Sequence, residues 1–511
     1  MSARTVLIVG AGPTGLTLAA WLAHQGVHAR IIDRTAEPGT TSRALAVQAR
    51  TLELYLQLGI TNTVLARGHK VPAVNLWVRG AHAARMPFEA IGAGLTRYPF
   101  LEIFPQDEHE RLLLEHLAAL GVRVERGTEL KDFTDQGEGI HARLLGPDGR
   151  EETLEAAYLA GCDGARSLVR ETLGTGFPGG TYRQVFYVAD IDGGGPALDG
   201  ELHIDLEEAD FLAVFPLAGA GRARLIGTVR DERAEHPEQL RFEDVSARAM
   251  HNLKVRVERV NWFSTYRVHH RVTEHFGKGR AFLLGDAAHI HSPAGGQGMN
   301  TGIGDAVNLA WKLAAVLQGR APPRLLDSYE AERIPFARRL VATTDRIFTF
   351  ATADGAIADF MRTRVAPLLM PRAVALAPVR EFLFRTVSQI TVNYRGSPLS
   401  AGAVGRVHGG DRLPWALAGG SDNYTALAAI SWQVHVYGTA REALTLWCQK
   451  HGVPLHVFPF APEHAAAGLT RDALYLLRPD TYLALAEASQ DPAVLERYGS
   501  ERALRLGAQG A

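Results

Sequence analysis

The chain has 511 residues, with 54 Lys and Arg against 55 Asp and Glu, which leaves a formal net charge of −1. This length predicts roughly two to four domains. Because a near-neutral chain lacks the basic surface that nucleic acid or an anionic membrane attracts, we expect neither as a partner. The two cysteines, Cys162 and Cys448, belong to no CxxC pair and are too few for a disulfide framework. The composition therefore favours a reducing, cytoplasmic setting.

The N-terminal part of the chain alternates between strand and helix patterns. We predict strands at Thr5–Val9 and His28–Asp33 and helices at Gly15–Gln25 and Gln48–Leu58. This alternation predicts an α/β domain that opens with a parallel βαβ unit. The apolar stretch Val6–Ala23 is broken by glycines and a proline, so we interpret it as strand, turn and helix rather than a signal peptide. No other apolar run is long enough to cross a membrane.

The turn after the first predicted strand has the GxGxxG pattern, from Gly10 to Gly15. The first glycine permits the tight turn, the second lets the backbone approach a pyrophosphate, and the third lets helix and strand pack closely. The helix N-terminus adds partial positive charge for the phosphates. Asp33, at the end of the next strand, is placed to accept a hydrogen bond from an adenosine ribose, and its charge disfavours the 2′-phosphate of NADP. The sequence therefore predicts one site for FAD or NAD.

The sequence pattern changes between Thr181 and Tyr266, where short β-like runs are separated by turns. This pattern predicts an antiparallel sheet inserted into the α/β unit. Beyond a Gly- and Pro-rich hinge, strands and helices alternate again. We therefore predict a discontinuous first domain over 1–180 and 268–395, a substrate domain over 181–267 and a third domain over 396–511. The elements predicted after residue 100 are helices at Glu108–Leu120, Thr301–Gln318, Arg441–His451 and Pro492–Leu504, and strands at Val122–Glu125, Gln184–Ile191, Phe211–Leu217, Ala223–Val229, Val260–Tyr266, Ala281–Gly285, Ser431–Tyr437, Leu455–Phe458 and Ala473–Leu477.

Two further motifs follow predicted buried strands. The first is Cys162-Asp163-Gly164-Ala165-Arg166-Ser167, and the second is a longer block that begins at Gly285-Asp286 and continues through a glycine-rich loop into the helix that carries Lys312. An aspartate at a strand end can hydrogen-bond a ligand hydroxyl. A glycine-rich loop that opens a helix can present backbone N–H groups to an anionic or carbonyl-bearing ligand. Together they suit the ribityl chain and pyrimidine edge of a flavin.

With these motifs the chain resembles the single-component (class A) FAD-dependent aromatic hydroxylases of the para-hydroxybenzoate and phenol hydroxylase type. The resemblance rests on the GxGxxG turn with Asp33, the stretch from Ser42 to Glu53, the Asp163-Gly164 block and the block from Gly285 to Lys312. It is closest to the branch that hydroxylates polycyclic polyketides. It implies an α/β fold with a Rossmann-like, GR2-type FAD-binding domain, an inserted antiparallel-sheet substrate domain and a C-terminal thioredoxin-like α/β domain without redox cysteines.

The resemblance also implies roles for individual residues. Asp33 would hold the adenosine ribose, Asp286 the ribityl hydroxyls, and the turn after Gly296 the isoalloxazine edge. Arg43 would face the pyrophosphate or ribityl side and Gln106 the flavin chain. The implied cofactor-binding residues are Gly10, Gly12, Pro13, Thr14, Gly15, Asp33, Arg34, Arg43, Gln106, Asp163, Asp286, Pro293, Gly296, Gly298, Met299 and Asn300.

The implied reaction uses FAD as cofactor, NADPH or NADH as a transient co-substrate, and O₂. A flavin C4a-hydroperoxide would transfer one oxygen to an aromatic, usually phenolic, small-molecule substrate. The candidates for catalytic roles are Tyr266 or a nearby Arg or His, with Arg267 the arginine, which would stabilise a phenolate, and Pro293, beside the flavin ring. The substrate would contact an aromatic face of the inserted sheet, although ordinary core packing explains these side chains equally well. They are Phe211, Phe215, Trp262 and Tyr266.

Several alternatives remain open from the sequence. The substrate is a polycyclic polyketide, a small phenolic acid or an antibiotic that hydroxylation inactivates, or the chain is a weakly catalytic flavin-fold protein that binds a reactive intermediate. The tryptophans do not form the WxWxIP motif of flavin-dependent halogenases. We expect no metal site, because the histidines between 269 and 291 lack HExxH spacing and a cysteine partner. Monomer and homodimer are equally compatible with the sequence.

Overall fold

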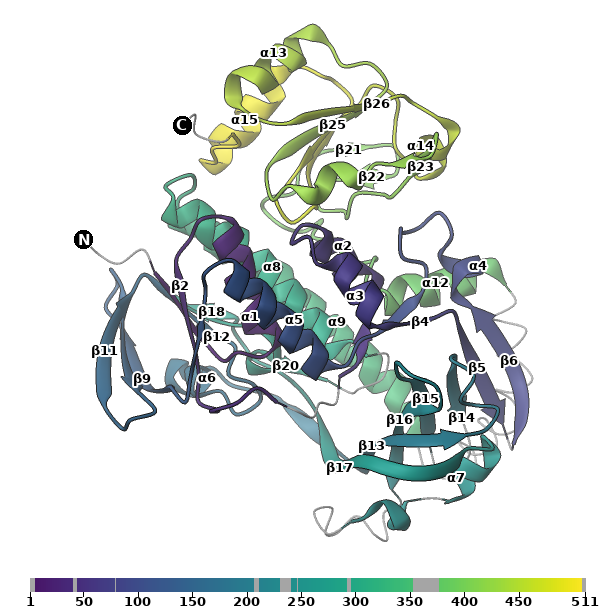
Figure 1. Cartoon of the computed structure of the whole chain (residues 1–511). Coiled ribbons are helices and arrows are strands. Elements are labelled where there is room, and N and C mark those ends of the chain that lie inside the picture. Colours follow the sequence, from purple (N-terminus) through teal and green to yellow (C-terminus); the bar gives the residue numbers. More distant parts are fainter. Residues whose placement is uncertain are drawn as a thin grey trace.

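The computed structural model describes residues 5–39, 44–78, 80–205, 211–229, 240–245, 247–291, 296–352 and 376–507 (Figure 1). The chain forms a mixed α/β fold with several sheets. In Figure 1 the C-terminal part, coloured yellow-green, lies above the N-terminal sheet and its helices, and the long strands β13 and β17 lie at the opposite end.

The N-terminal sheet has six strands in the order β18-β19-β12-β1-β2-β8. Its strand pairs are parallel except β18–β19. Every residue of β1 and β12 is buried, as expected for parallel strands covered on both faces. Helices α1, α5 and α8 pack together beside it (Figure 1). The bounds are β1 Val6–Val9, β2 Ala29–Asp33, β8 Val124–Arg126, β12 Tyr158–Gly161, β18 Gly277–Lys278, β19 Ala281–Leu283, α1 Pro13–His24, α5 Gln106–Ala119 and α8 Gly298–Leu317.

These elements confirm the predicted βαβ opening, with shifts at helix starts. Helix α1 begins at Pro13, two residues before the predicted start, because proline suits the first helical turn, where its missing N–H is not needed. Helix α8 begins at Gly298 rather than Thr301, so three glycine-loop residues belong to the helix. Next to this sheet lies a three-stranded antiparallel sheet of β9 Glu129–Asp135, β10 Ile140–Leu145 and β11 Glu151–Ala156, with α6 Leu168–Leu173.

The second large sheet has eight strands in the order β20-β17-β13-β16-β15-β14-β5-β6. Five of them come from the predicted insert, where the expected strands Gln184–Ile191 and Val260–Tyr266 prove to be parts of the long strands β13 and β17, and the other two expected strands correspond to β15 and β16. Strands β5 and β6 come from the part of the chain that the sequence assigns to the first domain, and β5 joins the sheet by parallel pairing with β14. The bounds are β5 Ala73–Val78, β6 Ala81–Pro87, β13 Gly179–Gly194, β14 Leu202–Asp205, β15 Leu212–Pro216, β16 Arg222–Val229, β17 Arg256–Val272 and β20 His289–Ile290.

A small antiparallel sheet packs against the eight-stranded sheet. It consists of β3 Ala46–Val47, β7 Leu101–Ile103 and β4 His69–Val71. Ala46, Leu101 and Ile103 belong to the same apolar cluster as Phe186 and Val188 of β13, so the small sheet packs on one face of the eight-stranded sheet. The opposite face is buried in a separate cluster with α7 Ala247–Asn252. Other helices are α2 Ala49–Leu56, α3 Thr61–Arg67, α4 Phe88–Gly92, α9 Asp327–Thr352 and α12 Ala377–Val387.

The C-terminal part has a four-stranded sheet in the order β26-β25-β27-β28. Strands β25 and β26 are parallel, and β27 and β28 are antiparallel to their neighbours. This βαβ unit followed by a ββα unit is the arrangement of the thioredoxin fold, as predicted. Cys448 is buried in α13, where burial raises the pKa of its thiol to about 11. The bounds are β25 Gln433–Tyr437, α13 Glu442–His451, β26 Leu455–Phe458, α14 Pro462–Ala466, β27 Leu474–Leu477, β28 Leu483–Glu487 and α15 Pro492–Arg502.

Candidate active site

The glycine turn between β1 and α1 has three different environments. Gly10 has φ +103°, and a Cβ there would lie 2.3 Å from the carbonyl oxygen of Cys162. A Cβ at Gly15 would lie 2.0 Å from the carbonyl oxygen of Gly10. A Cβ at Gly12 would have no protein atom within 4 Å. The first and third glycines thus allow the close packing of β1, β12 and α1, and the second leaves a backbone cradle of the kind that a pyrophosphate needs. Helix α1 begins at Pro13, and the first turn of this helix contains no acidic residue that would repel an anion.

Asp33 fastens this turn to the end of β2. Its Oδ2 accepts from the backbone N–H of Ala11 at 2.7 Å, and its Oδ1 accepts from the N–H and hydroxyl of Thr35 at 2.8 and 2.6 Å. Arg126, which ends the neighbouring strand β8, places Nη1 3.8 Å from Asp33 Oδ2. Its buried Nη2 has no hydrogen-bond partner in the part of the chain that the structure describes. An orphaned cationic donor beside the turn fits a phosphate or ribose oxygen. Arg34 is exposed next to Asp33.

The Asp163 block follows β12, at the same sheet edge as the glycine turn. Asp163 Oδ2 accepts from the backbone N–H of Val169 at 3.2 Å, and its buried Oδ1 has no partner among the described residues. Burial raises the pKa of this carboxyl. The neighbouring Cys162 thiol has a pKa well above its ordinary value, because burial and the carboxylate of Asp163 both oppose the thiolate. The block therefore offers a hydrogen-bonding carboxyl oxygen and no nucleophile.

The Gly285 block meets the glycine turn at Thr14. Cβ atoms built on Gly285 and Gly302 would lie 2.7 and 2.3 Å from the Thr14 hydroxyl, so only glycines allow this approach. Asp305 holds the loop: it accepts from the N–H of Gly285 at 3.0 Å, from His289 Nε2 at 2.7 Å and from Arg333 Nε at 2.6 Å. Asp286, next in the chain, is exposed.

Sequence reasoning missed the buried trio of Asp305, His289 and Arg333 as a support for this loop. Burial alone would raise the pKa of Asp305, but Arg333 and His289 outweigh it, so the pKa lies below its ordinary range. The carboxylate therefore stays charged and the loop stays fixed. The signal was present, because Asp305 belongs to the motif block, but its partner Arg333 lies 28 residues further on.

The first turn of α8 forms the far side of the candidate site. Gly296 has φ +61°, and a Cβ there would lie 2.8 Å from Ala46 Cβ. No acidic residue stands in this turn, so its backbone N–H groups and the helix dipole favour an electronegative ligand edge. Met299 Sδ lies 3.3 Å from His109 Nδ1. Gly298 is half-buried at the start of the helix.

The Asn300 side chain joins α8 to an earlier segment of the chain. Its Oδ1 accepts from the N–H of Gln48 at 2.9 Å and from the Thr51 hydroxyl at 2.7 Å, and its Nδ2 donates to the carbonyls of Ala46 and Gly296 at 2.8 and 2.9 Å. The amide is thus fully used in joining α8 to the 44–51 segment and to Gly296. Gln106 is half-buried and donates to Glu110 Oε1 at 2.8 Å.

Arg43 and Pro293, predicted at this site, lie outside the described residues. The predicted aromatic face is assembled as expected: Phe211, Phe215, Trp262 and Tyr266 are half-buried and pack against one apolar cluster that also contains Ala46. Because Asn300 and Gly296 both contact Ala46, the apolar cluster on this face extends to the α8 turn. Arg267 follows Tyr266 in β17, so alternation turns it to the other face, and it is exposed. The structure therefore separates Arg267 from Tyr266 as a potential pair.

Among the described residues, no group of three or more His, Cys, Asp and Glu side chains is arranged to hold a metal ion. No helix in the described ranges is long and apolar enough to cross a membrane. His289, from the histidine-rich stretch, is instead engaged with Asp305.

A protein-family model described as an FAD-binding domain matches residues 3–344, which is most of the chain and includes every motif above. The chain belongs to this family of FAD-dependent monooxygenases. It is 39% identical over 412 residues to 6-methylpretetramide 4-monooxygenase of Streptomyces rimosus, covering 78% of this chain and 71% of the relative. It is 32% identical to a flavin-dependent monooxygenase of Mycobacteroides abscessus over 508 residues, 95% of this chain and 97% of the relative.

Solved structures extend the similarity over the whole length. The anhydrotetracycline hydroxylase of Streptomyces rimosus superimposes with a TM-score of 0.78 at 29% identity, covering 99% of both chains. A ternary complex of aklavinone-11 hydroxylase with FAD and aklavinone superimposes with a TM-score of 0.79 at 26% identity, again over 99% of both chains. The fold of this monooxygenase is therefore that of FAD-dependent aromatic hydroxylases, including the thioredoxin-like C-terminal part.

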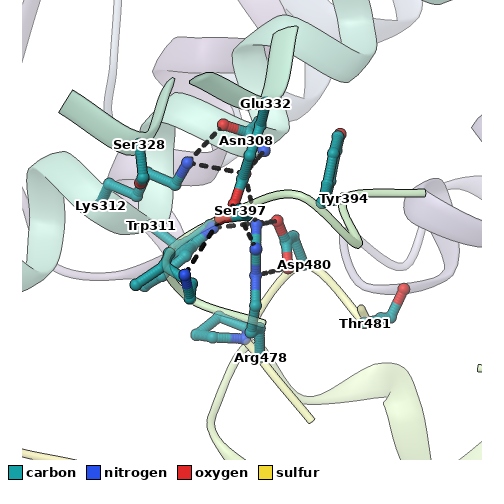
Figure 2. Close-up of polar contacts among 12 residues, drawn as sticks. Asn308, Trp311, Lys312, Ser328, Glu332, Tyr394, Ser397, Arg478, Asp480 and Thr481 are labelled. Atoms are coloured by element: carbon teal, nitrogen blue, oxygen red, sulfur yellow. Dashed lines mark hydrogen bonds and ion pairs between the residues drawn. The ribbon is translucent and has the colours of Figure 1, made fainter. Parts of the chain in front are cut away.

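The C-terminal part of the monooxygenase docks through a buried ionic cluster (Figure 2). Arg478, from the β27–β28 loop, donates Nη1 and Nη2 to the two oxygens of Glu332 on α9 at 2.6 and 2.9 Å. Lys312 Nζ and Asn308 Nδ2 on α8 donate to the same carboxylate at 2.8 and 2.6 Å. Asp480 accepts from Arg478 Nε at 2.9 Å and from Trp311 Nε1 at 3.0 Å. Charges of both signs are thus paired inside the interface, with no side chain of the cluster left charged and alone.

A second buried ionic cluster joins the C-terminal part to helix α2. Glu53 accepts from Arg412 Nε at 2.8 Å, from Arg50 Nη1 at 3.2 Å and from the Thr96 hydroxyl at 2.6 Å. Arg50 also donates Nη2 to the carbonyl of Asp480 at 3.0 Å. Burial would raise the pKa of Glu53, but Arg412 outweighs it and the pKa lies below its ordinary range. The segment that carries Gln48 and Thr51, both bound to Asn300, is therefore fixed from the C-terminal side as well.

Proposed function

We propose that this monooxygenase hydroxylates a phenolic, fused-ring substrate of the polyketide type. The observation that carries the proposal is the aromatic face of the eight-stranded sheet, which lies beside the α8 turn through Ala46. In support, relatives are named for 6-methylpretetramide, 12-dehydrotetracycline and anhydrotetracycline, and the structural neighbour aklavinone-11 hydroxylase was solved with aklavinone and FAD. An aromatic face of this kind packs well against a flat ring system.

In this proposal the motif residues hold FAD. The backbone around Gly12 and the orphaned Nη2 of Arg126 would bind the pyrophosphate and ribose end. Asp163, with its unpaired Oδ1, and the exposed Asp286 would accept from hydroxyls of the flavin chain. The N–H groups of the first α8 turn would face the isoalloxazine edge. When bound and reduced by NADPH or NADH, FAD supplies the activation of O₂ from which one oxygen atom passes to the ring and the other leaves as water.

The chain itself would orient the substrate and exclude water. Tyr266 is the one predicted catalytic side chain placed on the aromatic face, where its hydroxyl is suited to hold a substrate oxygen and favour its phenolate form. The carboxylate of Asp305 keeps the Gly285 loop in place during the reaction. We further propose a cytoplasmic setting, in agreement with two unpaired cysteines whose thiol pKa values are raised.

A second candidate is inactivation of an antibiotic by the same chemistry. A rifampicin monooxygenase of Streptomyces venezuelae is 36% identical over 405 residues, covering 76% of this chain and 79% of the relative.

The test uses the purified, FAD-loaded protein with NADPH or NADH and air. Anhydrotetracycline, rifampicin and pentachlorophenol are added separately, and both cofactor oxidation and product mass are measured. The proposal expects faster NAD(P)H oxidation with anhydrotetracycline and a product heavier by one oxygen atom. Oxidation that no aromatic compound accelerates, with hydrogen peroxide as the sole product, would contradict it. A rifampicin product alone would favour the second candidate.

A further inference from the structure

One polar pair interrupts the apolar face that carries Trp262 and Tyr266. Arg224 of β16 lies opposite Asp190 of β13 and opposite Phe215 of β15, and Asp190 lies opposite Trp262 of β17. Residues paired across neighbouring strands point to the same face. Phe215, Arg224, Asp190 and Trp262 therefore form one row across four strands, on the face beside the candidate flavin site.

The Arg224 guanidinium is held rigidly but is not fully used. Its Nε and Nη2 donate to the two oxygens of Asp190 at 2.6 and 2.8 Å, and its Cζ lies 5.5 Å from the centre of the Trp262 ring. The residue is 2% exposed. Its buried Nη1 has no hydrogen-bond partner among the residues that the structure describes. A buried guanidinium N–H without an acceptor is costly, so each such group calls for an explanation, such as a bound water, an ion or a ligand that supplies the acceptor.

The row lies at the end of the face that is remote from the flavin site. Tyr266 is four residues from Trp262 along β17, so the two side chains are separated by about 13 Å. Beyond Tyr266, the same strand pairs with β20, which follows directly after the Gly285 loop. A single aromatic ring that contacts the flavin end does not reach Arg224, whereas several fused rings in line span this distance.

We propose that Arg224 Nη1 is a distal subsite that donates a hydrogen bond to an acidic or carbonyl oxygen of the substrate. This oxygen lies on the ring furthest from the one that is hydroxylated. Asp190 is the positioning residue that fixes the guanidinium plane. The inference rests on the proposed function and narrows its substrate class to fused-ring compounds with an electronegative oxygen at the distal end.

The test compares two probes on the FAD-loaded enzyme. Anhydrotetracycline has four fused rings with acidic oxygens on its terminal ring, and pentachlorophenol has a single ring. Binding is followed through the change in flavin absorbance. In Arg224→Met, anhydrotetracycline is expected to bind about 10- to 100-fold more weakly, because a hydrogen bond to a charged group is lost. Pentachlorophenol is expected to bind within about twofold of wild type, because it does not reach the row.

The matched control is Arg143→Met. Arg143 also pairs across strands with an aspartate, Asp132, but this pair is exposed on the three-stranded sheet. Its removal should leave the binding of both probes unchanged. Arg224→Lys guards against misfolding of the methionine variant. Lysine keeps a buried positive charge beside Asp190 but lacks the additional N–H donors of the guanidinium. The Arg224→Lys variant should therefore fold and retain FAD, and still lose affinity for anhydrotetracycline.

The outcomes separate the two levels of the proposal. Equal effects of the Arg224 substitutions on both probes, or no effect on either, would overturn the distal subsite. So would a wild-type enzyme that hydroxylates pentachlorophenol but does not bind anhydrotetracycline. If neither aromatic compound accelerates NAD(P)H oxidation or yields an oxygenated product, the proposed function fails. A selective loss with anhydrotetracycline supports the subsite.

Discussion

Substituting Arg478 with methionine tests whether the buried ionic cluster holds the C-terminal part in place. Arg478 is fully buried and contacts both oxygens of Glu332 and both oxygens of Asp480. Without it, Glu332 keeps Lys312, Asn308 and Ser397 as donors, but among the described residues Asp480 keeps only the Trp311 indole as a side-chain donor. Removing one partner of a buried ion pair costs about 3–5 kcal/mol. Because Asp480 is left with a single neutral donor, we expect a loss of about 4 kcal/mol.

The assay is urea unfolding of the FAD-loaded protein, followed by tryptophan fluorescence. Trp311 and Trp432 lie in the interface with ring centres 5.7 Å apart, so the signal reports on docking. Arg471→Met is the control, since Arg471 is exposed on the same domain, where its guanidinium lies over the Phe460 ring. Its effect should stay below about 1 kcal/mol. A loss below about 1 kcal/mol for Arg478→Met, or equal losses for both variants, would refute the reasoning.

The pH dependence gives a second criterion for the same variant. Burial would raise the pKa of Glu332, but Arg478 and Lys312 outweigh it and hold the pKa well below its ordinary value of 4.5. This stabilising contribution is present above pH 4.5 and disappears as the pH falls towards the lowered pKa. The difference in unfolding free energy between wild type and Arg478→Met should therefore shrink below pH 4.5. A difference that stays constant with pH would show that the charge of Glu332 is not involved.

Three further predictions concern the glycine turn and two buried titratable groups. Gly15→Ala should destabilise the protein by about 3 kcal/mol, because its Cβ would meet the Gly10 carbonyl. Gly12→Ala should fold normally and bind FAD more weakly. Thermal unfolding and flavin fluorescence distinguish the two variants. Burial raises the pKa of Glu102 to about 8, so the free energy of unfolding should fall as the pH rises from 4.5 to 8. Glu102→Gln should remove this slope and raise the free energy of unfolding by up to about 3 kcal/mol at pH 7. Burial lowers the pKa of Lys312 to about 8 despite the attraction of a carboxylate. Between pH 8 and 10.5 the unfolded chain therefore binds more protons than the folded protein, and the free energy of unfolding should rise with pH. Lys312→Met should lack that rise, and a variant that keeps it would contradict the assignment.

The sequence predicted the features that short spacings determine. The glycine turn, Asp33 and the Gly285 block each lie within one strand–turn–helix unit, so their residue types and distances along the chain were sufficient. Local alternation also predicted a separate C-terminal α/β part, and the family resemblance implied its thioredoxin-like fold. The aromatic face was predicted because side chains two or four residues apart in a strand share a side.

Long-range partners were not predictable in this way. The joining of β5 to β14 depends on residues more than 120 positions apart, and the pairing of Glu53 with Arg412 spans 359 positions. The hydrogen bonds of the Asn300 amide go to a segment some 250 residues earlier in the chain. No local pattern records such contacts, because they arise only when separate elements pack together.

The two ionic clusters have a consequence for building chimeras. Arg50, Glu53, Trp311 and Lys312 belong to the sequence blocks that mark the flavin domain, yet their side chains bind residues of the C-terminal part or their immediate partners. A C-terminal domain exchanged from another hydroxylase would bury these charges opposite new neighbours. Such a graft is compatible only if the donor supplies an arginine and an aspartate in its β27–β28 hairpin and an arginine where Arg412 stands. The exchangeable unit is therefore the domain together with its matching helices α2, α8 and α9.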